Sequence, residues 1–155
     1  MKKLSIVFAL LSGFAACSDD ENNETPVTPA PTETLSFTGK LEALPDEGSR
    51  FEAFSEEGIA MQLQPTADGR YHLLMPEIKF VAQMPWLSIE VRDLQDSAEG
   101  ESIRFEAAET IPYFMGAPYD AFPIANLSGL YDAATGSFSL AFDCNTMLVR
   151  YTGQR

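Results

Sequence analysis

Leu87-Ser-Ile-Glu-Val-Arg92 contains the clearest alternation of apolar and polar residues in this chain. Successive side chains of a β-strand point to opposite faces of the sheet, so this pattern predicts a strand with one face in a core and the other in water. The same period returns in Phe138-Ser-Leu-Ala-Phe-Asp-Cys144. Half-buried strands of this kind are typical of antiparallel sheets.

Similar patterns follow one another from residue 35 to the end of the chain. Residues 71–80 are interrupted by Pro76, which indicates a sheet edge or a bulge. Glu57-Gly58 is expected to join two strands, and two further stretches have the composition of turns because their residues tolerate positive φ. These stretches are Ala67-Asp-Gly-Arg70 and Asp132-Ala-Ala-Thr-Gly136.

About eight short strands with turns between them predict an all-β domain spanning residues 35–155, either an antiparallel sandwich or a single antiparallel β-barrel. The interior of a barrel of this size is either filled by side chains or holds one small ligand. The spacing of the residues leaves both alternatives open. A domain of this length buries enough surface to fold without disulfides.

Residues 111–123, Ile-Pro-Tyr-Phe-Met-Gly-Ala-Pro-Tyr-Asp-Ala-Phe-Pro, are apolar but contain three prolines. A central strand does not accept proline because the ring removes a ladder hydrogen bond, so this segment is expected to fold as an ordered apolar loop. Such rings can line a pocket or form a contact surface; alternatively, the loop only plugs one end of the barrel. The candidate ligand-binding residues are Trp86, Tyr113, Phe114, Tyr119 and Phe122.

The first 16 residues have the layout of a signal peptide. Lys2 and Lys3 form a basic start, residues 4–11 are apolar, and small residues precede Cys17. The apolar run is shorter than the roughly 20 residues that a spanning helix needs. Phe14-Ala-Ala-Cys17 resembles the lipobox of bacterial lipoproteins, which implies lipid attachment to Cys17 and a membrane anchor at that residue.

The residues behind Cys17 predict where the protein is displayed. Ser18-Asp-Asp-Glu21 resembles the surface-export signal of Bacteroidetes lipoproteins, which implies an outer-membrane protein exposed on the cell surface. Alternatively, these acids belong to a solvated linker. Residues 17–34 lack apolar periodicity and contain several prolines, so they are expected to form a disordered tether.

The polar loop that contains Asp96-Ser97-Ala98 carries a candidate modification site. This tripeptide resembles the O-glycosylation acceptor of exported Bacteroidetes proteins, which makes Ser97 the candidate residue. Tripeptides of this kind also arise by chance. A polar loop residue without any modification is therefore the alternative.

The chain is acidic, with 23 Asp and Glu residues against 10 Lys and Arg residues and a formal net charge of -13. A phosphate backbone requires a basic face, so this charge excludes nucleic acid as a partner. Cys17 and Cys144 are the only cysteines. A lipidated Cys17 leaves Cys144 without a partner, so no internal disulfide is expected. The sequence leaves the oligomeric state open.

No catalytic or metal-binding pattern stands out. His72 is the only histidine, which excludes a histidine-rich zinc site, and the common nucleophile and phosphate-loop motifs are missing. Asp143-Cys-Asn145 lacks the other oxygen ligands and the glycine of a calcium loop, so it predicts a turn. No catalytic residue, cofactor or metal is expected. The enzymatic alternative is a glycan-acting hydrolase that uses two carboxylates.

Short segments in a fixed order are similar to the calycin-like β-barrel domain of Bacteroidetes lipoproteins. They are Ile78-Lys-Phe80, Met84-Pro85, Ile89-Glu-Val91, Leu127-Ser-Gly129 and Val149-Arg-Tyr-Thr-Gly153. The resemblance covers most of residues 35–155 and implies a closed barrel of about eight strands. It implies no functional residues, because a fold alone does not define an activity.

The sequence therefore leads to two main expectations about function. The first is a surface-anchored lipoprotein whose barrel binds a small apolar ligand, a glycan or a protein without catalysis. The second is a structural component of an envelope assembly with a plugged barrel.

Overall fold

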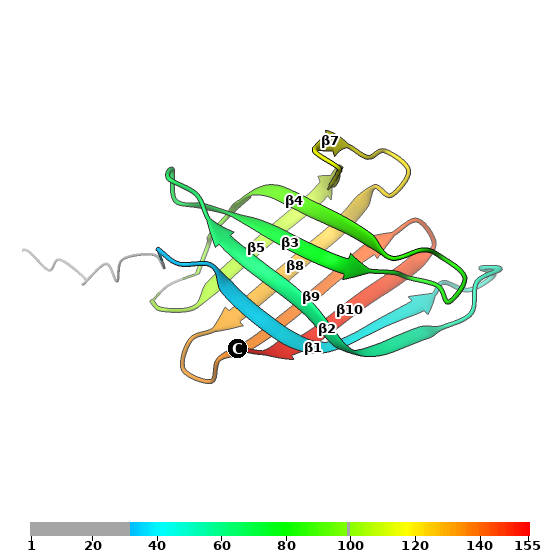
Figure 1. The fold of residues 1–155 in the computed structure, drawn as a ribbon, viewed down its shortest axis with the longest axis horizontal. Helices are drawn as coiled ribbons and strands as arrows, with labels where there is room; N and C mark the ends of the chain where they lie inside the picture. Colours follow the sequence, from blue (N-terminus) through cyan, green and yellow to red (C-terminus); the bar gives the residue numbers. More distant parts are fainter. Residues whose placement is uncertain (1–31, 99) are drawn as a thin grey trace, which may run out of the picture.

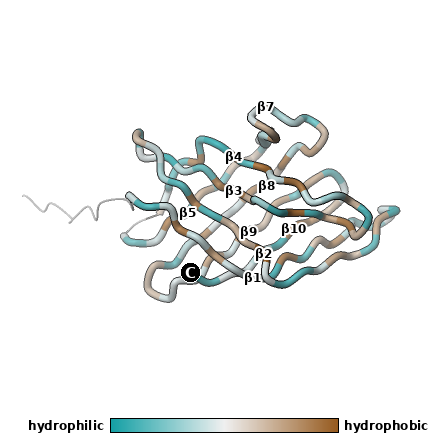
Figure 2. The backbone as a smooth tube through the Cα atoms, viewed as in Figure 1, coloured by the Kyte–Doolittle hydropathy of each residue, from teal (hydrophilic) through white to brown (hydrophobic). Residues whose placement is uncertain are grey.

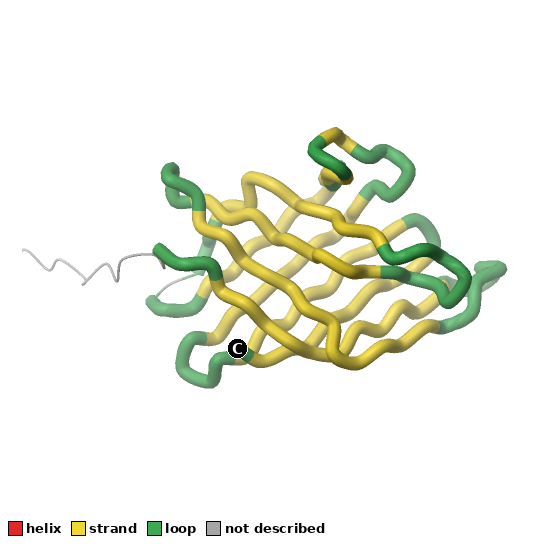
Figure 3. Tube along the Cα trace, viewed as in Figure 1, coloured by secondary structure: helices red, strands yellow, loops and turns green. Residues whose placement is uncertain are grey.

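The computed structural model describes residues 32–98 and 100–155, and every regular element in these ranges is a β-strand. The antiparallel strands form one sheet that curls into a barrel-like shape (Figure 1), which confirms the predicted all-β, barrel-like fold. Figure 3 shows only turns and loops between the strands. None of the described residues belongs to a helix long and apolar enough to cross a membrane. The predicted signal peptide, Cys17 and the tether up to residue 31 lie outside the described residues.

The sheet contains ten strands, whereas the sequence predicted about eight. Their order is β5-β8-β9-β10-β1-β2-β3-β4-β6-β7, so β5 and β7 are the edges. The bounds are β1 (Leu35–Pro45), β2 (Phe54–Pro65), β3 (Arg70–Ile78), β4 (Leu87–Gln95), β5 (Ile103–Thr110), β6 (Tyr113–Phe114), β7 (Ala117–Pro118), β8 (Ile124–Asp132), β9 (Ser137–Cys144) and β10 (Met147–Gln154).

Two layers of strands face each other across the interior. Strands β1 to β4 form the nearer layer in Figure 1, and β5, β8, β9 and β10 form the layer behind it. The layers are continuous through the pairing of β1 with β10. Strands β4 and β5 come close, but no strand ladder joins them within the described ranges. The hairpin of β6 and β7 pairs with β4, with Phe114 opposite Ile89, so it extends the sheet beyond β4.

Burial follows the predicted alternation along most of the strands. In β9, every second residue from Phe138 to Cys144 is buried. In β4 the phase changes at Asp93, which has a φ of 59°. Val91 is buried before this residue and Leu94 after it. A left-handed residue inside a strand produces a bulge, and the sequence pattern did not indicate this one.

Packed side chains occupy the middle of the barrel. Phe138 lies at the centre of an aromatic cluster, with ring-centroid distances of 4.5 Å to Phe37, 6.0 Å to Tyr151 and 6.3 Å to Phe105. All four side chains are almost completely buried. Figure 2 shows the alternation of hydrophobic and hydrophilic residues along the strands as brown and teal segments. Burial of these large apolar surfaces is the main favourable term in the stability of the fold.

Residues 111–123 are not a loop throughout, as predicted, but contain the short strands β6 and β7. Met115 and Gly116 connect these strands with φ values of 51° and 81°, which are the left-handed values of a tight hairpin turn. Pro118 lies in β7 at the edge of the sheet, where a missing backbone N–H breaks no ladder. Proline excludes a central strand but not an edge hairpin, and this hairpin adds two strands to the count.

Glu57 and Gly58 do not separate two strands, as predicted, but lie within the continuous strand β2. The register between β1 and β2 shifts between Gly39 and Leu41, and Gly58 has a φ of 76°. A bulge adds a residue to a strand without ending it. The residue types that form turns therefore also bend a continuous strand.

The connections between strands gather at two ends of the barrel. The end where the chain enters β1, called the entry end here, also holds the C-terminus (Figure 1). Glu33 and Arg155 form an ion pair there. The opposite end is called the distal end. Its connections are residues 46–53, 79–86, 111–123 and 145–146. All five candidate aromatic residues therefore lie at the distal end.

Candidate functional site

Three of the five candidate aromatic residues form one row at the distal end. The ring centroids of Phe114 and Tyr119 are 5.2 Å apart, and those of Tyr119 and Phe122 are 5.5 Å apart. The row continues inward to the buried Phe80, whose ring lies 6.0 Å from that of Phe122. Phe114 and Phe122 pack against the core. Tilted rings at these distances attract one another beyond the effect of burial, so the row holds the segment against this end of the barrel.

Trp86 takes part in a different contact and is 47% exposed. The Nζ atom of Lys79 lies 4.4 Å from the centre of the Trp86 ring and 5.1 Å from the centre of the Phe54 ring. A cation over an aromatic face is attracted by the ring quadrupole. Lys79 therefore links a ring at the start of β2 with a ring just before β4, and the two rings offer an aromatic surface beside a positive charge.

Tyr113 lines a groove on the outside of the distal end. The guanidinium carbon of Arg92 lies 4.0 Å from the centre of the Tyr113 ring, and the Nη2 atom of Arg92 donates to Oε2 of Glu90 at 3.0 Å. This hydrogen bond raises the pKa of Arg92. The groove has a volume of about 240 Å³ and runs between Tyr113, Met115 and Pro76. Met115 is 88% exposed at the tip of the hairpin.

A further concavity, which the sequence did not indicate, lies beside the two ends of residues 111–123. Its volume is about 550 Å³, and Ile111, Pro123, Ile124 and Ala125 form its apolar part. We call it the corner pocket. Its other lining residues are Glu109, Thr110, Asp143 and Asn145. These residues come from three strands and two connections, so no local pattern in the sequence could bring them together.

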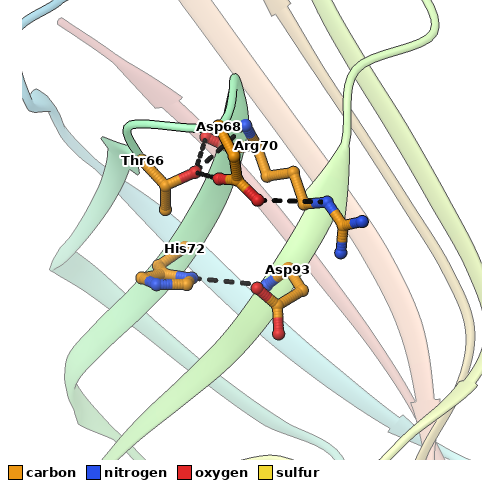
Figure 4. Close-up of polar contacts among 5 residues, drawn as sticks. All are labelled: Thr66, Asp68, Arg70, His72 and Asp93. Atoms are coloured by element: carbon orange, nitrogen blue, oxygen red, sulfur yellow. Dashed lines mark hydrogen bonds and ion pairs between the residues drawn. The ribbon is translucent and has the colours of Figure 1, made fainter.

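His72 has a structural partner at the entry end (Figure 4). Its Nδ1 atom accepts a hydrogen bond from the backbone N–H of Asp93 at 3.3 Å. Asp93 is the left-handed residue of β4, so His72 stabilises the bulge there. In the adjacent hairpin, the Thr66 hydroxyl donates to the Asp68 carboxylate, which lowers the pKa of Asp68. The backbone N–H of Arg70 donates to the same hydroxyl at 3.0 Å.

Cys144 is 2% exposed and packs in the core. Desolvation raises the pKa of its thiol to about 12, so the thiol stays protonated at neutral pH and is a poor nucleophile.

Within residues 32–98 and 100–155, no three His, Cys, Asp or Glu side chains are grouped so that they could hold a metal ion.

Ser97 lies exposed in the loop between β4 and β5 at the entry end. Its backbone N–H donates to the carbonyl of Arg104 at 2.8 Å. The Oδ1 atom of Asp96 accepts hydrogen bonds from the backbone N–H groups of Ala98 and Arg104, at 2.8 and 3.0 Å. The Ser97 hydroxyl also donates to the Arg104 carbonyl, at 3.3 Å. Residues 96–98 are thus tied to the start of β5, and Ser97 is exposed.

Comparison with protein-family models, with curated proteins and with solved structures finds no match to this chain. Function is therefore inferred from the distal end itself. Its exposed Trp86, the groove beside Tyr113 and the corner pocket offer apolar and charged surface to a partner.

Proposed function

We propose that this protein is an outer-membrane lipoprotein, anchored through lipid on Cys17 and exposed on the cell surface, whose barrel binds a partner without catalysis. The lipobox supports the lipid anchor, and the acidic residues that follow Cys17 support display on the cell surface. Several acyl chains on one cysteine give stable attachment. The long strands and the segments similar to calycin-like lipoproteins support a calycin-like barrel.

One structural observation carries this proposal: the aromatic connections lie at the end of the barrel opposite to the entry of the chain. Strand β1 starts at the entry end, directly behind the predicted tether. A tether fixed to the membrane therefore lets the distal end face outward. Trp86 and Met115 are exposed at this end, and exposed apolar side chains that gather in one region mark interaction sites.

A protein or glycan surface is the partner class that suits the distal end best. Packed aromatic side chains occupy the barrel interior, and the rings of Phe114, Tyr119 and Phe122 contact one another. The rings of Trp86 and Tyr113 each lie next to a cation, and Trp86 is 47% exposed. Aromatic and arginine side chains are enriched at contact surfaces because they combine large apolar area with hydrogen-bonding or charged groups.

The row of Phe114, Tyr119 and Phe122 favours a second candidate function, that of a structural component with a plugged barrel. The row continues to Phe80 and the core, as expected for a plug. The two functions differ in one respect. A plug requires only the row of Phe114, Tyr119 and Phe122, whereas binding also requires Trp86 or Tyr113.

The anchor is tested with Cys17→Ala in the native host. We expect the wild-type protein in the outer-membrane fraction, accessible to protease added to intact cells, and the variant released from that fraction. Membrane association that survives Cys17→Ala would contradict the lipid anchor. Wild-type protein that the protease leaves uncut on intact cells would contradict exposure on the cell surface.

Binding is tested by screening the full-length protein against glycans, lipids and host proteins. Trp86→Ala and Tyr113→Ala are each expected to weaken a genuine hit by roughly tenfold or more, because aromatic residues dominate such contacts. Leu130→Ala, on β8 away from the distal connections, is the control and should leave the hit unchanged. A hit that neither aromatic substitution affects would place the site elsewhere, and release of shortened glycans would identify a hydrolase.

Glycosylation of Ser97 is proposed as a modification of the native protein and is tested by mass. Ser97 is exposed beside the start of β5, where a transferase can reach it. We expect the intact mass of the host-purified protein to exceed that of Ser97→Ala by one glycan. Masses that differ only by the substitution itself would reject the modification.

A further inference from the structure

The corner pocket combines an apolar floor with charged rims, and none of the five candidate aromatic residues lines it. Its volume of about 550 Å³ lies within the range of small-molecule sites. Ile111 and Pro123 contribute apolar walls from the two ends of residues 111–123, and Ala125 contributes only a methyl group. The pocket therefore has room for an aliphatic chain above Ala125.

The register of three strands creates the charged rims. Ala125 of β8 pairs with Glu109 of β5 on one side and with Asp143 of β9 on the other. Neighbouring strands are about 4.8 Å apart, so the Cα atoms of the two acids lie about 10 Å apart, with Ala125 between them. Two carboxylates on either side of an apolar floor suit a molecule with an aliphatic body and positively charged ends.

The carboxylate of Asp143 is held in place by the neighbouring strand. The Nδ2 atom of Asn126 donates to Oδ2 of Asp143 at 2.7 Å, and Asn126 has a φ of 50° at the bulge of β8. This bond leaves Oδ1 of Asp143 as an acceptor for a ligand. Neither Asp143 nor Glu109 forms an ion pair with another residue that the structure describes. The net charge of -13 adds a field that attracts cations.

We propose that the corner pocket binds an organic amine with an aliphatic body, and that a linear diamine fits it best. One ammonium group contacts Asp143, the other contacts Glu109, and the methylenes cover Ala125 and Ile111. Binding involves no covalent step. The inference goes beyond the proposed function because it uses neither Trp86 nor Tyr113. Failure of one therefore leaves the other intact.

Hexane-1,6-diamine is the probe, titrated into the full-length protein and followed by calorimetry and by amide chemical shifts. Two exposed ion pairs and partial burial of the methylenes correspond to a dissociation constant on the order of 1 mM. We expect saturable binding, with shift changes confined to residues 109–111, 123–126 and 143–145. Hexylamine, which has one ammonium group, should bind about threefold to fivefold more weakly. Hexanoate, which is negatively charged, should not saturate.

The variants distinguish binding in the corner pocket from a general attraction of cations to an acidic protein. Asp143→Asn and Glu109→Gln should each weaken the diamine about threefold to fivefold, and the double variant about tenfold or more. Ala125→Leu should also weaken it, because the larger side chain fills the floor without changing the charge. Glu106→Gln is the matched control, since Glu106 lies on the same strand as Glu109 but outside the pocket.

Four results would overturn the proposal. They are no saturation at about 10 mM diamine, shift changes away from the pocket, hexanoate binding as well as the diamine, and unchanged affinity in the double variant. An equal loss of affinity in Glu106→Gln and Glu109→Gln would also show that the effect is only that of net charge.

Discussion

The hydroxyl of Tyr151 on β10 donates a hydrogen bond to the backbone carbonyl of Ile59 on β2, at 3.1 Å. These strands are not neighbours, because β1 lies between them in the sheet. Tyr151 is 1% exposed, so the bond forms inside the barrel. It satisfies the Ile59 carbonyl next to the point where the register of β1 and β2 shifts. The core therefore contains a polar tie where regular strand pairing is interrupted.

Tyr151→Phe should lower the free energy of unfolding by about 1–2 kcal/mol, because it removes this bond and leaves the buried Ile59 carbonyl without its partner. Urea unfolding followed by circular dichroism measures the change. Tyr71→Phe is the matched control. Tyr71 is equally buried, but its hydroxyl has no hydrogen-bond partner among the described residues, so its removal should be neutral or stabilising. Equal losses in both variants would contradict the role of the tie.

The protein should become less stable in alkali, where the buried Cys144 thiol and Tyr151 phenol lose their protons on unfolding. Desolvation raises the pKa of Cys144 and that of Tyr151 to about 12, whereas the unfolded chain has values of about 8.5 and about 10. The folded state therefore favours the neutral thiol and the neutral phenol. Their contribution to the free energy of unfolding is complete at pH below the unfolded pKa values and is lost as pH rises toward the folded pKa values.

Urea unfolding at a series of pH values measures this loss. In the wild type, the free energy of unfolding should start to fall near pH 8.5, at up to about 1.4 kcal/mol per pH unit for each group. In Cys144→Ala the decline should begin only near pH 10, where tyrosine titrates. The same pH profile in both proteins would contradict a shifted thiol.

Gly129→Ala should destabilise the barrel by about 1–3 kcal/mol through overpacking. A Cβ atom at residue 129 would lie 2.2 Å from the nearest ring carbon of Phe105, and Phe105 is completely buried. Denaturant unfolding of Gly129→Ala, Phe105→Leu and the double variant forms a complete cycle. The double variant should lose less than the sum of the single losses, because leucine leaves room for the new methyl group. Additive losses would show that the two side chains do not compete for space.

Phe122→Ala should cost about 2 kcal/mol or more, whereas Met115→Ala should change the free energy of unfolding by less than about 0.5 kcal/mol. Phe122 contacts both Tyr119 and the buried Phe80, but Met115 is exposed at the hairpin tip. Thermal and denaturant unfolding of the two variants test the difference. A large loss in Met115→Ala would mean that the tip packs against the barrel in solution.

Residues 87–92 and 138–144 show what could be predicted from the sequence. Side chains alternate between the two faces of any strand, so the period in these segments is a local property and indicates strands before their neighbours are known. The same holds for the hairpin turn at residues 67–70, which depends on the φ values its residues tolerate. The signal peptide and the lipobox stay predictions, because residues 1–31 lie outside the described part of the chain.

The aromatic residues of segment 111–123 could be named as candidates from their composition, but not sorted into roles. Phe114 and Tyr119 pack in a row that leads to the core, whereas Tyr113 lines an outer groove. Strand β6 determines this division, because adjacent residues of a strand point to opposite faces. The three prolines predict a loop there, so the sequence does not assign the faces.

Only the tertiary structure places Glu109, Ala125 and Asp143 side by side on three paired strands. It alone also shows the bulge at Asp93, whose backbone N–H donates to His72. Each strand pattern states that a segment is a strand, but not which strand lies beside it or in which register. Pairing is decided when all the strands meet around one core, and a slip of one residue moves every side chain to the other face. Bulges at Asp93 and Asn126 shift the alternation of buried and exposed residues within their strands. Each bulge depends on how the strand is paired with its neighbours, so the sequence of one strand does not reveal it.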